Sequence, residues 1–285
     1  MAFSQNASNN PWRLAETASM QDEATKLGYQ LTVTDANNEQ AKQIQDIKGL
    51  IAQQPDALFI APITEQLASV VKEAAQAKIP VFLLDRDVDN TVAKPGEQFV
   101  TVIVSDFVQQ GKRAAWAMAN ATGGNAKIIE LEGTTGSSPA IDRKKGFDEE
   151  IRQCPGLQVV VSQSADFTRA EGQSVTETLL QSHPDATAIY AHNDEMALGA
   201  IAAVRAAGKT PGRDIQVVSI DGSRDALTAV DAGDLYTSVE SNPRFGPKAF
   251  ETMKQYAGGQ VPVKLVLEDR LFNKANAGQN IESAY

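Results

Sequence analysis

The chain has 285 residues, enough for one large domain or two ordinary ones of roughly 100 to 200 residues each. Its 26 Lys and Arg against 36 Asp and Glu give a formal charge of −10, and no basic run is longer than 143–145, which argues against nucleic-acid binding. Apolar runs such as 79–84 are far shorter than the about 20 residues that cross a bilayer, so we expect no membrane insertion.

The single cysteine, Cys154, cannot form a disulfide within the chain and says little about the cellular compartment. The first residues lack a basic stretch followed by an apolar one. A leader peptide is therefore either absent or already removed.

Short apolar runs rich in β-branched residues alternate with amphipathic stretches along the whole chain, which is typical of βαβ units and parallel sheets. The predicted strands are 2–5, 30–35, 57–60, 81–84, 101–104, 127–131, 159–163, 188–190, 215–220 and 237–239. The predicted helices are 12–27, 39–53, 66–77, 108–121, 141–151, 170–181, 195–207, 226–232 and 244–256. This number of strands indicates two sheets, and we predict an α/β fold of two Rossmann-like lobes.

Glycines follow three of the predicted helices, and capping side chains precede three helices, one of which also ends at such a glycine. These residues are Gly28, Gly208, Gly233, Asp106, Thr168 and Asn193. The helix ends are therefore marked by local chemistry as well as by periodicity.

No Gly/Ser-rich or Pro-rich linker divides the chain, so the two lobes must be joined by strand crossings that act as a hinge. The candidate crossings are 105–107, 240–243 and 268–272. We predict an N-terminal lobe of 1–105 plus 243–268 and a C-terminal lobe of 106–242 plus 269–285.

Polar segments follow five of the ten predicted strands, at the carboxyl ends where open parallel sheets bind ligands. The candidate side chains in them are Asn10, Trp12 and Arg13, then Asp85 and Arg86, then Asn193, Asp221 and Glu240. We expect them to face a gap shared by the two lobes.

Asp85 and Arg86 directly follow the apolar run 79–84. They could form a structural ion pair or a helix cap. They could also bind neighbouring hydroxyls of a ligand, because Asp only accepts hydrogen bonds and Arg only donates them, whereas a hydroxyl does both.

Asn193 and Asp221 are each explained by helix capping when taken alone, and their equivalent positions favour a ligand site. His192 is interpreted as a packed residue rather than a base. Arg143 begins a charged stretch that is explained as a solvated helix face, and its place after the loop 133–138 keeps it as a candidate.

Trp12 and Phe167 lie beside polar loop residues rather than within apolar stripes, although Phe167 could equally be a core residue. Two aromatic rings could sandwich a sugar ring, whose C–H faces are apolar and whose rim carries hydroxyls.

The sequence lacks a dinucleotide-binding GxGxxG after a strand, a Walker loop, HExxH, a cysteine cluster and GxSxG. Asp85 and Asp221 could form a glycosidase carboxylate pair, but Arg86 argues against a raised pKa there. We expect no enzyme activity, no cofactor and no metal.

Six segments spread along the chain form a recognisable set: NNPW (9–12), IPVFLLDR (79–86), AIDRKKGF (140–147), DFTR (166–169), HNDEMALGA (192–200) and IDG (220–222). Through these segments the sequence resembles the type I periplasmic sugar-binding proteins of ABC transporters, the ribose-binding-like group, over nearly its whole length. Within that family it is most similar to the galactofuranose-binding members.

The resemblance implies sugar contacts from Asn10, Trp12, Arg13, Asp85 and Arg86 in the first lobe. It implies further contacts from Arg143, Phe167, Asn193, Asp221 and Glu240 in the second, with Glu240 standing where ribose binders have Gln. Arg169 and Ser4 are weaker candidates.

The resemblance further implies a monomeric periplasmic receptor that closes on a monosaccharide and delivers it to an ABC transporter permease. The sugar would be a galactofuranose-like furanose, another pentose or hexose, or a polyol. The alternative is the sugar-responsive effector domain of a lactose-repressor-type regulator, which would need a DNA-binding headpiece.

Overall fold

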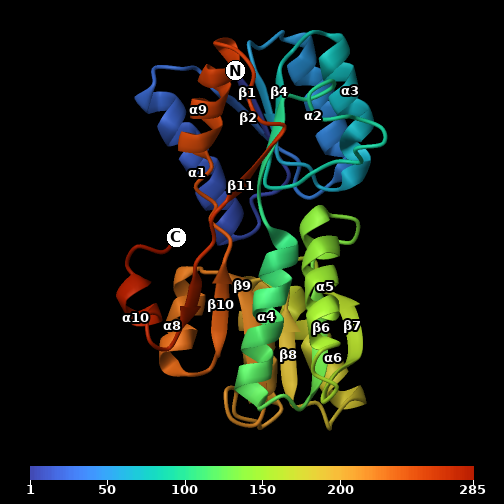
Figure 1. Cartoon of the computed structure of the whole chain (residues 1–285), viewed down its shortest axis with the longest axis vertical. Coiled ribbons are helices and arrows are strands. Elements are labelled where there is room, and N and C mark those ends of the chain that lie inside the picture. The colour runs from blue at the N-terminus through green and yellow to red at the C-terminus, as the bar shows by residue number, and fades with distance from the viewer. The chain divides into compact units, whose positions relative to one another are not determined.

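The computed structural model describes all 285 residues and consists of two compact units. Unit 1 comprises Met1–Ser105, Gly136–Ser138 and Asn242–Glu268, and unit 2 comprises Asp106–Thr135, Pro139–Ser241 and Asp269–Tyr285. Each unit contains one six-stranded sheet with helices on both of its faces (Figure 1).

The sheet of unit 1 is entirely parallel, in the order β11-β5-β4-β3-β1-β2. Its strands are β1 (Ala2–Gln5), β2 (Thr32–Asp35), β3 (Leu58–Ile60), β4 (Val81–Leu84), β5 (Thr101–Ser105) and β11 (Lys264–Leu267). Its helices are α1 (Pro11–Lys26), α2 (Gln40–Ala52), the short 3₁₀ helix η1 (Glu65–Leu67), α3 (Ala68–Gln76) and α9 (Gly246–Ala257).

The apolar runs of the central strands explain why the middle of this sheet is buried. Phe59 and Phe82 on neighbouring strands have ring centroids 5.4 Å apart, and Phe250 of α9 lies 5.2 Å from Phe59. This aromatic cluster fixes α9, although α9 is far from these strands in sequence. Because Phe82 belongs to β4, the cluster also packs this strand firmly between its neighbours.

The sheet of unit 2 has the order β12-β10-β9-β8-β6-β7 and is parallel except for the β10–β12 pair. Its strands are β6 (Ala126–Glu132), β7 (Leu157–Ser164), β8 (Ala188–Ala191), β9 (Gln216–Asp221), β10 (Thr237–Glu240) and β12 (Leu271–Asn273). Its helices are α4 (Phe107–Thr122), α5 (Ser138–Ile151), α6 (Arg169–Ser182), α7 (Asp194–Ala206), α8 (Arg224–Ala232) and α10 (Ala277–Asn280).

Successive side chains of the β strands in unit 2 point into two different apolar cores. Ile129 and Ile189 belong to the core with α6, α7 and α8, whereas Ile128, Ala188 and Tyr190 belong to the core with α4 and α5. Both faces of this sheet are therefore covered by helices. Because successive side chains of a strand point to opposite faces, the apolar residues of these strands are buried on both sides.

The predicted fold class is confirmed, and the structure contains further elements that were not predicted. The ten predicted strands are present within a few residues, and β11, β12 and α10 are additional. Asp106, Thr168 and Asn193 cap helices as expected, and Gly233 ends α8 in the left-handed conformation with φ 87°. All of the helices are too short or too polar to cross a bilayer.

A buried charge cluster joins β6 and β7 to α5 in unit 2. Glu130 is fully buried, and it accepts hydrogen bonds from Lys144 Nζ at 2.5 Å and from Ser162 Oγ at 2.7 Å, with His192 Nε2 at 3.1 Å. Burial alone raises the pKa of Glu130, but these partners outweigh it and lower the pKa to about 2. Glu130 is therefore a structural carboxylate, and His192 is its packed partner.

We predict that acid removes the stabilisation that Glu130 provides. Its folded pKa is about 2 against an ordinary 4.5, so its contribution is present above pH 4.5 and is lost as the pH falls to 2. The unfolding free energy of the wild type, minus that of Glu130→Gln, should fall by about 3 kcal/mol over this range, measured by urea denaturation at several pH values.

Glu132→Gln is the matched control for this measurement, because Glu132 lies on the same strand, is partly exposed and is 3.7 Å from Lys144. This variant removes one partly exposed carboxylate, so its free energy of unfolding should stay within about 0.5 kcal/mol of the wild-type value at neutral pH. Parallel curves for the wild type and Glu130→Gln would contradict the assignment.

Candidate functional site

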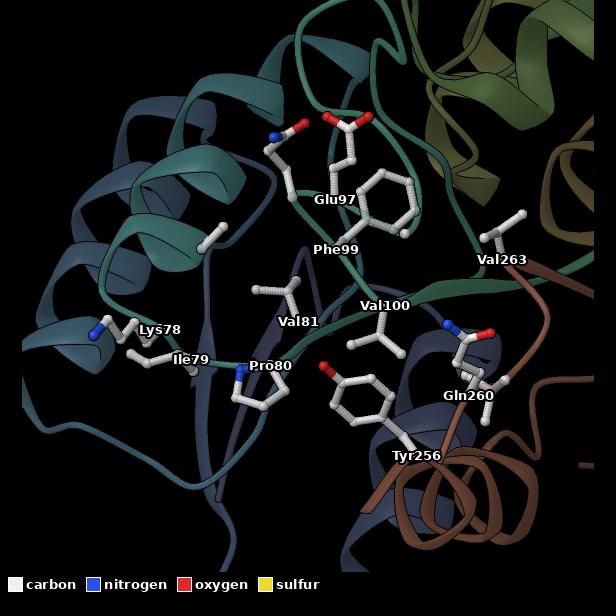
Figure 2. Close-up of a pocket in the computed structure, with 14 residues that line it drawn as sticks. Lys78, Ile79, Pro80, Val81, Glu97, Phe99, Val100, Tyr256, Gln260 and Val263 are labelled. Atoms are coloured by element: carbon white, nitrogen blue, oxygen red, sulfur yellow. The ribbon is translucent and has the colours of Figure 1, made fainter. Parts of the chain in front are cut away.

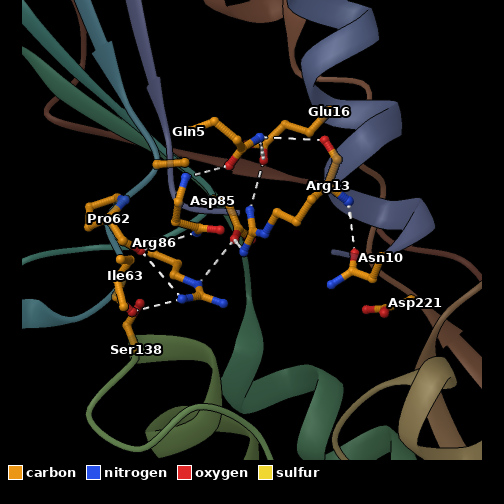
Figure 3. A network of polar contacts seen from close by, with 12 residues as sticks. Gln5, Asn10, Arg13, Glu16, Pro62, Ile63, Asp85, Arg86, Ser138 and Asp221 are labelled. Atoms are coloured by element: carbon orange, nitrogen blue, oxygen red, sulfur yellow. Dashed lines mark hydrogen bonds and ion pairs between the residues drawn. The ribbon is translucent and has the colours of Figure 1, made fainter. Parts of the chain in front are cut away.

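The candidate residues of unit 1 lie where β4 ends and where α1 begins. Asn10 is the N-cap of α1 and accepts a hydrogen bond from Arg13 N at 2.9 Å, and Pro11 occupies the first helical position. Both features fix the start of the helix. The start of α1 therefore directs Arg13 toward Asp85 at the end of β4 (Figure 3).

Arg13 is the centre of a buried ion-pair network in unit 1. It contacts Asp85 Oδ2 at 2.5 Å through Nη2 and Glu16 Oε2 at 2.8 Å through Nη1. Gln5 of β1 donates to the same Glu16 oxygen at 2.9 Å (Figure 3). Two carboxylates therefore share one guanidinium, and this sharing holds all three charged groups in fixed positions.

Burial is the main influence on the pKa values in this network. Burial raises the pKa of Glu16, and the negative charge of Asp85 adds to the rise, although Arg13 opposes it. For Arg13, burial alone lowers the pKa, but Asp85 and Glu16 outweigh this and the pKa is raised. Arg13 is therefore a permanent cation in this site.

Arg86 is held by backbone carbonyls rather than by a second acid. Its Nη1 donates to Ile63 O at 2.7 Å, and its Nε lies 3.6 Å from Asp85 Oδ2 (Figure 3). Asp85 and Arg86 are each 4% exposed, so the ion pair considered from the sequence is present and lies in buried surroundings.

Trp12 lies beside this network. The guanidinium of Arg13 is 4.4 Å from the centre of its ring, and the ring edge packs against Phe245 at 6.0 Å. The indole is therefore fixed between a cation and an aromatic ring of the segment leading to α9.

In unit 2, Arg143 of α5 has the central position that Arg13 has in unit 1. Its Nη1 donates to His192 O at 2.6 Å, its Nε to Gln110 Oε1 at 2.9 Å, and its Nη2 lies 3.5 Å from Asp221 Oδ1. Arg143 is 4% exposed. It is therefore part of the buried polar end of the sheet and does not lie on a solvated helix face.

Asn193 and Phe167 are linked by a direct hydrogen bond. Asn193 Oδ1 caps α7 by accepting from Met196 N at 3.0 Å, and its Nδ2 donates to Phe167 O at 3.1 Å. A Cβ at Gly133 would lie 1.9 Å from the Phe167 ring, so only glycine leaves room for the ring there. The capping interpretation of Asn193 is correct, and the amide has a second partner.

Three candidate residues have left-handed backbone conformations, which L side chains rarely adopt. Their φ angles are 62° at Asp85, 60° at Phe167 and 136° at Asp221. Such conformations cost of order 1 to 3 kcal/mol and gather at functional sites. The strain lies at the carboxyl ends of strands in both units.

Glu240 has a protein partner that the sequence did not indicate. Arg270 donates to it through Nε at 2.8 Å, through Nη2 at 2.8 Å and through its backbone N at 2.9 Å. The antiparallel pairing of β10 with β12 places the two residues together. Three acceptor positions of this carboxylate are thereby occupied.

The two weaker candidates have structural partners. Arg169 pairs with both oxygens of Glu195, at 2.9 and 2.7 Å, and with Asp225 at 2.8 Å, and its side chain is 45% exposed. Ser4 is buried within β1, and its hydroxyl accepts from Gln43 at 3.4 Å. Neither belongs to the two networks centred on Arg13 and Arg143.

Sequence reasoning missed two residues that take part in these networks, Glu16 and Gln110, and a buried polar group near the second network, Tyr285. The hydroxyl of Tyr285 is buried and has no hydrogen-bond partner. Burial raises its pKa well above the ordinary value, and the charges of Asp221 and Asp194 raise it further. The segment 275–285, for which no motif was found, therefore carries a polar group to the end of β9.

Each unit also has a pocket at the opposite end of its sheet. The pocket of unit 1, about 550 Å³, is lined by Pro80 and Val81 at the start of β4 and by Tyr256 (Figure 2). The pocket of unit 2, about 540 Å³, includes Tyr236 and Thr237 at the start of β10. Neither contains any of the predicted site residues, which follow the strands.

Comparison with known proteins finds relatives over nearly the whole chain. A family model described as a periplasmic binding protein domain matches residues 1–260. The galactofuranose-binding protein YtfQ of Escherichia coli (strain K12) is 40% identical over 273 residues, covering 94% of this chain and 85% of that protein.

Two solved structures match nearly the whole chain. The crystal structure of a galactofuranose binding protein has a TM-score of 0.95 at 36% identity, covering 99% of this chain and 97% of that one. The periplasmic binding protein of the arabinose ABC transporter from Shewanella sp. ANA-3, bound to α- and β-L-arabinofuranose, has a TM-score of 0.94 at 37% identity, with 99% and 94% covered.

These relatives are named as binding proteins and not as enzymes, in agreement with the expectation from the sequence. A family model over most of the chain, a relative of high identity and two structures of the same fold identify the same group. The chain belongs to the periplasmic binding protein family.

Proposed function

We propose that the chain binds one monosaccharide in its furanose form, using side chains of both units that close around it, and delivers it to an ABC importer. The observation that carries this proposal is the pair of buried polar networks at the strand ends, each with an aromatic ring beside it. The names of the relatives, which bind galactofuranose and arabinofuranose, support the class of ligand.

The balance of charge favours a neutral ligand. In unit 1 two cations, Arg13 and Arg86, are paired with two carboxylates, those of Asp85 and Glu16. In unit 2 Arg143 stands beside Asp221. Since each network is already neutralised, an ionised ligand would leave a buried charge without compensation.

The remaining hydrogen-bonding capacity suits hydroxyls. A hydroxyl both donates and accepts, so it can bridge a carboxylate such as Asp85 and a guanidinium such as Arg86. Asn193 uses one of its two amide protons on Phe167 O, which leaves the other for a ligand oxygen. The rings of Trp12 and Phe167 suit the C–H faces of a sugar.

The proposed ligand contacts are the ten residues predicted from the sequence, and one of them, Glu240, has limited capacity for further hydrogen bonds. They are Asn10, Trp12, Arg13, Asp85, Arg86, Arg143, Phe167, Asn193, Asp221 and Glu240. Glu240 keeps a single free acceptor position beside Arg270, so we assign it at most one hydrogen bond to the sugar.

The proposed partner is the membrane permease of the importer, and the proposed location is extracytoplasmic. Both are supported by the relative that is named as the periplasmic binding protein component of an arabinose ABC transporter. We propose that the receptor acts as a monomer, because one chain supplies both sets of contacts.

Calorimetric titration with L-arabinose, D-galactose, D-ribose, D-fructose and myo-inositol tests the function, and absence of binding across this panel would overturn it.

We predict that Arg86→Ala weakens sugar binding by about 100-fold or more, because hydrogen bonds to a charged group contribute about 1.5 to 3 kcal/mol each. Arg86→Lys should also bind weakly, since an ammonium lacks the planar fork. Calorimetry measures the affinity, and thermal unfolding measures whether the fold persists.

Lys48→Ala is the control for Arg86, because Lys48 is an exposed cation of unit 1 whose partner is Glu73 at 3.2 Å. Its affinity should equal that of the wild type. An Arg86→Ala protein that folds and binds as tightly as the control would remove Arg86 from the site.

We predict that Asn193→Ser separates capping from sugar binding. Serine keeps a capping oxygen for α7 but has no amide protons, so binding should weaken about tenfold while stability stays near that of the wild type. Asn193→Ala should lose the same affinity and about 1 kcal/mol of stability as well. Equal affinity of Asn193→Ser and the wild type would leave Asn193 with the capping role alone.

A further inference from the structure

Gln110, in the first turn of α4, uses its side-chain amide to connect three separate parts of unit 2. Its Oε1 accepts from Arg143 Nε at 2.9 Å. Its Nε2 donates to Glu240 O at 3.1 Å and to Asp269 Oδ2 at 2.8 Å. Gln110 is 1% exposed, and both of its amide protons are used.

The partners of Gln110 lie at the places where the chain passes from one unit to the other. Its backbone N donates to Asp106 O at 2.8 Å, and Asp106 is the first residue of unit 2 after Ser105. Glu240 directly precedes Ser241, where unit 2 is left again, and Asp269 is the residue at which it is re-entered. One side chain and its own backbone thus contact residues beside three of the points at which the chain passes between the units, and these three are called the crossings.

The surrounding contacts make this junction stiff. Arg113, on the next turn of α4, donates to Asp269 O at 2.6 Å. Arg270 holds Glu240 through both carboxylate oxygens. A Cβ at Gly111 would lie 2.1 Å from Arg143 O, so α4 and α5 are in backbone contact beside Gln110. Arg143 therefore has little freedom to move independently of the crossings.

We propose that Gln110 is a positioning residue that sets the orientation of the Arg143 guanidinium from the three crossings. The inference rests on the proposed function, in which Arg143 binds the sugar. An arginine fixed in this way presents its remaining N–H groups in one orientation only. Sugar held by Arg143 would in turn bias the backbone of the crossings, because the coupling acts in both directions.

The chemistry requires an amide at this position. The side chain must accept from Arg143 and donate to Glu240 O and Asp269 at the same time, and glutamine does both. An ionised glutamate could still accept from Arg143, but it would donate nothing and would face the carboxylate of Asp269. Gln110→Glu is therefore nearly isosteric. It removes the hydrogen bonds to Glu240 O and Asp269 and keeps the one from Arg143.

The test compares Gln110→Glu and Gln110→Leu with Gln109→Ala, the matched control. Gln109 is the adjacent glutamine of α4 and is partly exposed, whereas Gln110 is buried. Calorimetry uses the sugars of the panel above that the wild type binds. We expect affinity to fall at least tenfold in both Gln110 variants and to be unchanged in the control.

Hydrogen exchange gives a second readout that needs no sugar. The amides of 240–241 and 269–271 should exchange at least tenfold faster in Gln110→Glu than in the wild type, while those of β8 stay unchanged. The double variant Gln110→Glu with Asp269→Asn restores a donor to the glutamate and should recover part of both the affinity and the protection. If Gln110→Leu fails to fold, the comparison of Gln110→Glu with the double variant decides whether Gln110 has the positioning role.

The outcomes separate this inference from the proposed function. A wild type that binds no sugar of the panel overturns the function, and the exchange data then decide whether Gln110 secures the crossings. A wild type that binds, together with a folded Gln110→Glu of equal affinity, overturns the positioning role and leaves the function intact. Loss of affinity with unchanged exchange would overturn the coupling to the crossings.

Discussion

The ion pair between Arg13 and Asp85 is the interaction on which the candidate site of unit 1 depends. A carboxylate buried at the end of β4 without a cation would cost several kcal/mol, so Asp85 requires a partner that is buried with it. Arg13 supplies the charge from α1, and Glu16, which accepts a hydrogen bond from Gln5, holds the guanidinium in place. The packing of α1 on its sheet is thus a condition for the polar chemistry at the strand end.

Unit 2 solves the same problem with different residues. Its central cation, Arg143, comes from α5 and is fixed by a backbone carbonyl and by Gln110 rather than by two carboxylates. The left-handed backbone at Asp85, Phe167 and Asp221 indicates that both units accept local strain to aim these side chains. The two halves share a principle of construction, a buried guanidinium at the carboxyl edge of a parallel sheet.

The sequence predicted most of the fold because βα repetition and helix caps are local signals. It missed β11, whose side chains are partly exposed, and β12, which is short and antiparallel to its neighbour β10. The second omission hid the pairing of Glu240 with Arg270, because that contact exists only through the antiparallel register. Gln110 was missed for a related reason: a lone amide on a helix has no recognisable spacing, and its partners are distant in sequence.

The setting of the two tryptophans has a practical consequence. Trp12 is buried with the Arg13 cation 4.4 Å from its ring, whereas Trp116 is 49% exposed and donates to Glu150 at 2.6 Å on the surface of unit 2. Indole emission depends on nearby charge and solvent, so the two fluorophores differ in what they sense. With Trp116 replaced by phenylalanine, Trp12 would be the only tryptophan left. The tryptophan fluorescence would then report on the strand end of unit 1 alone.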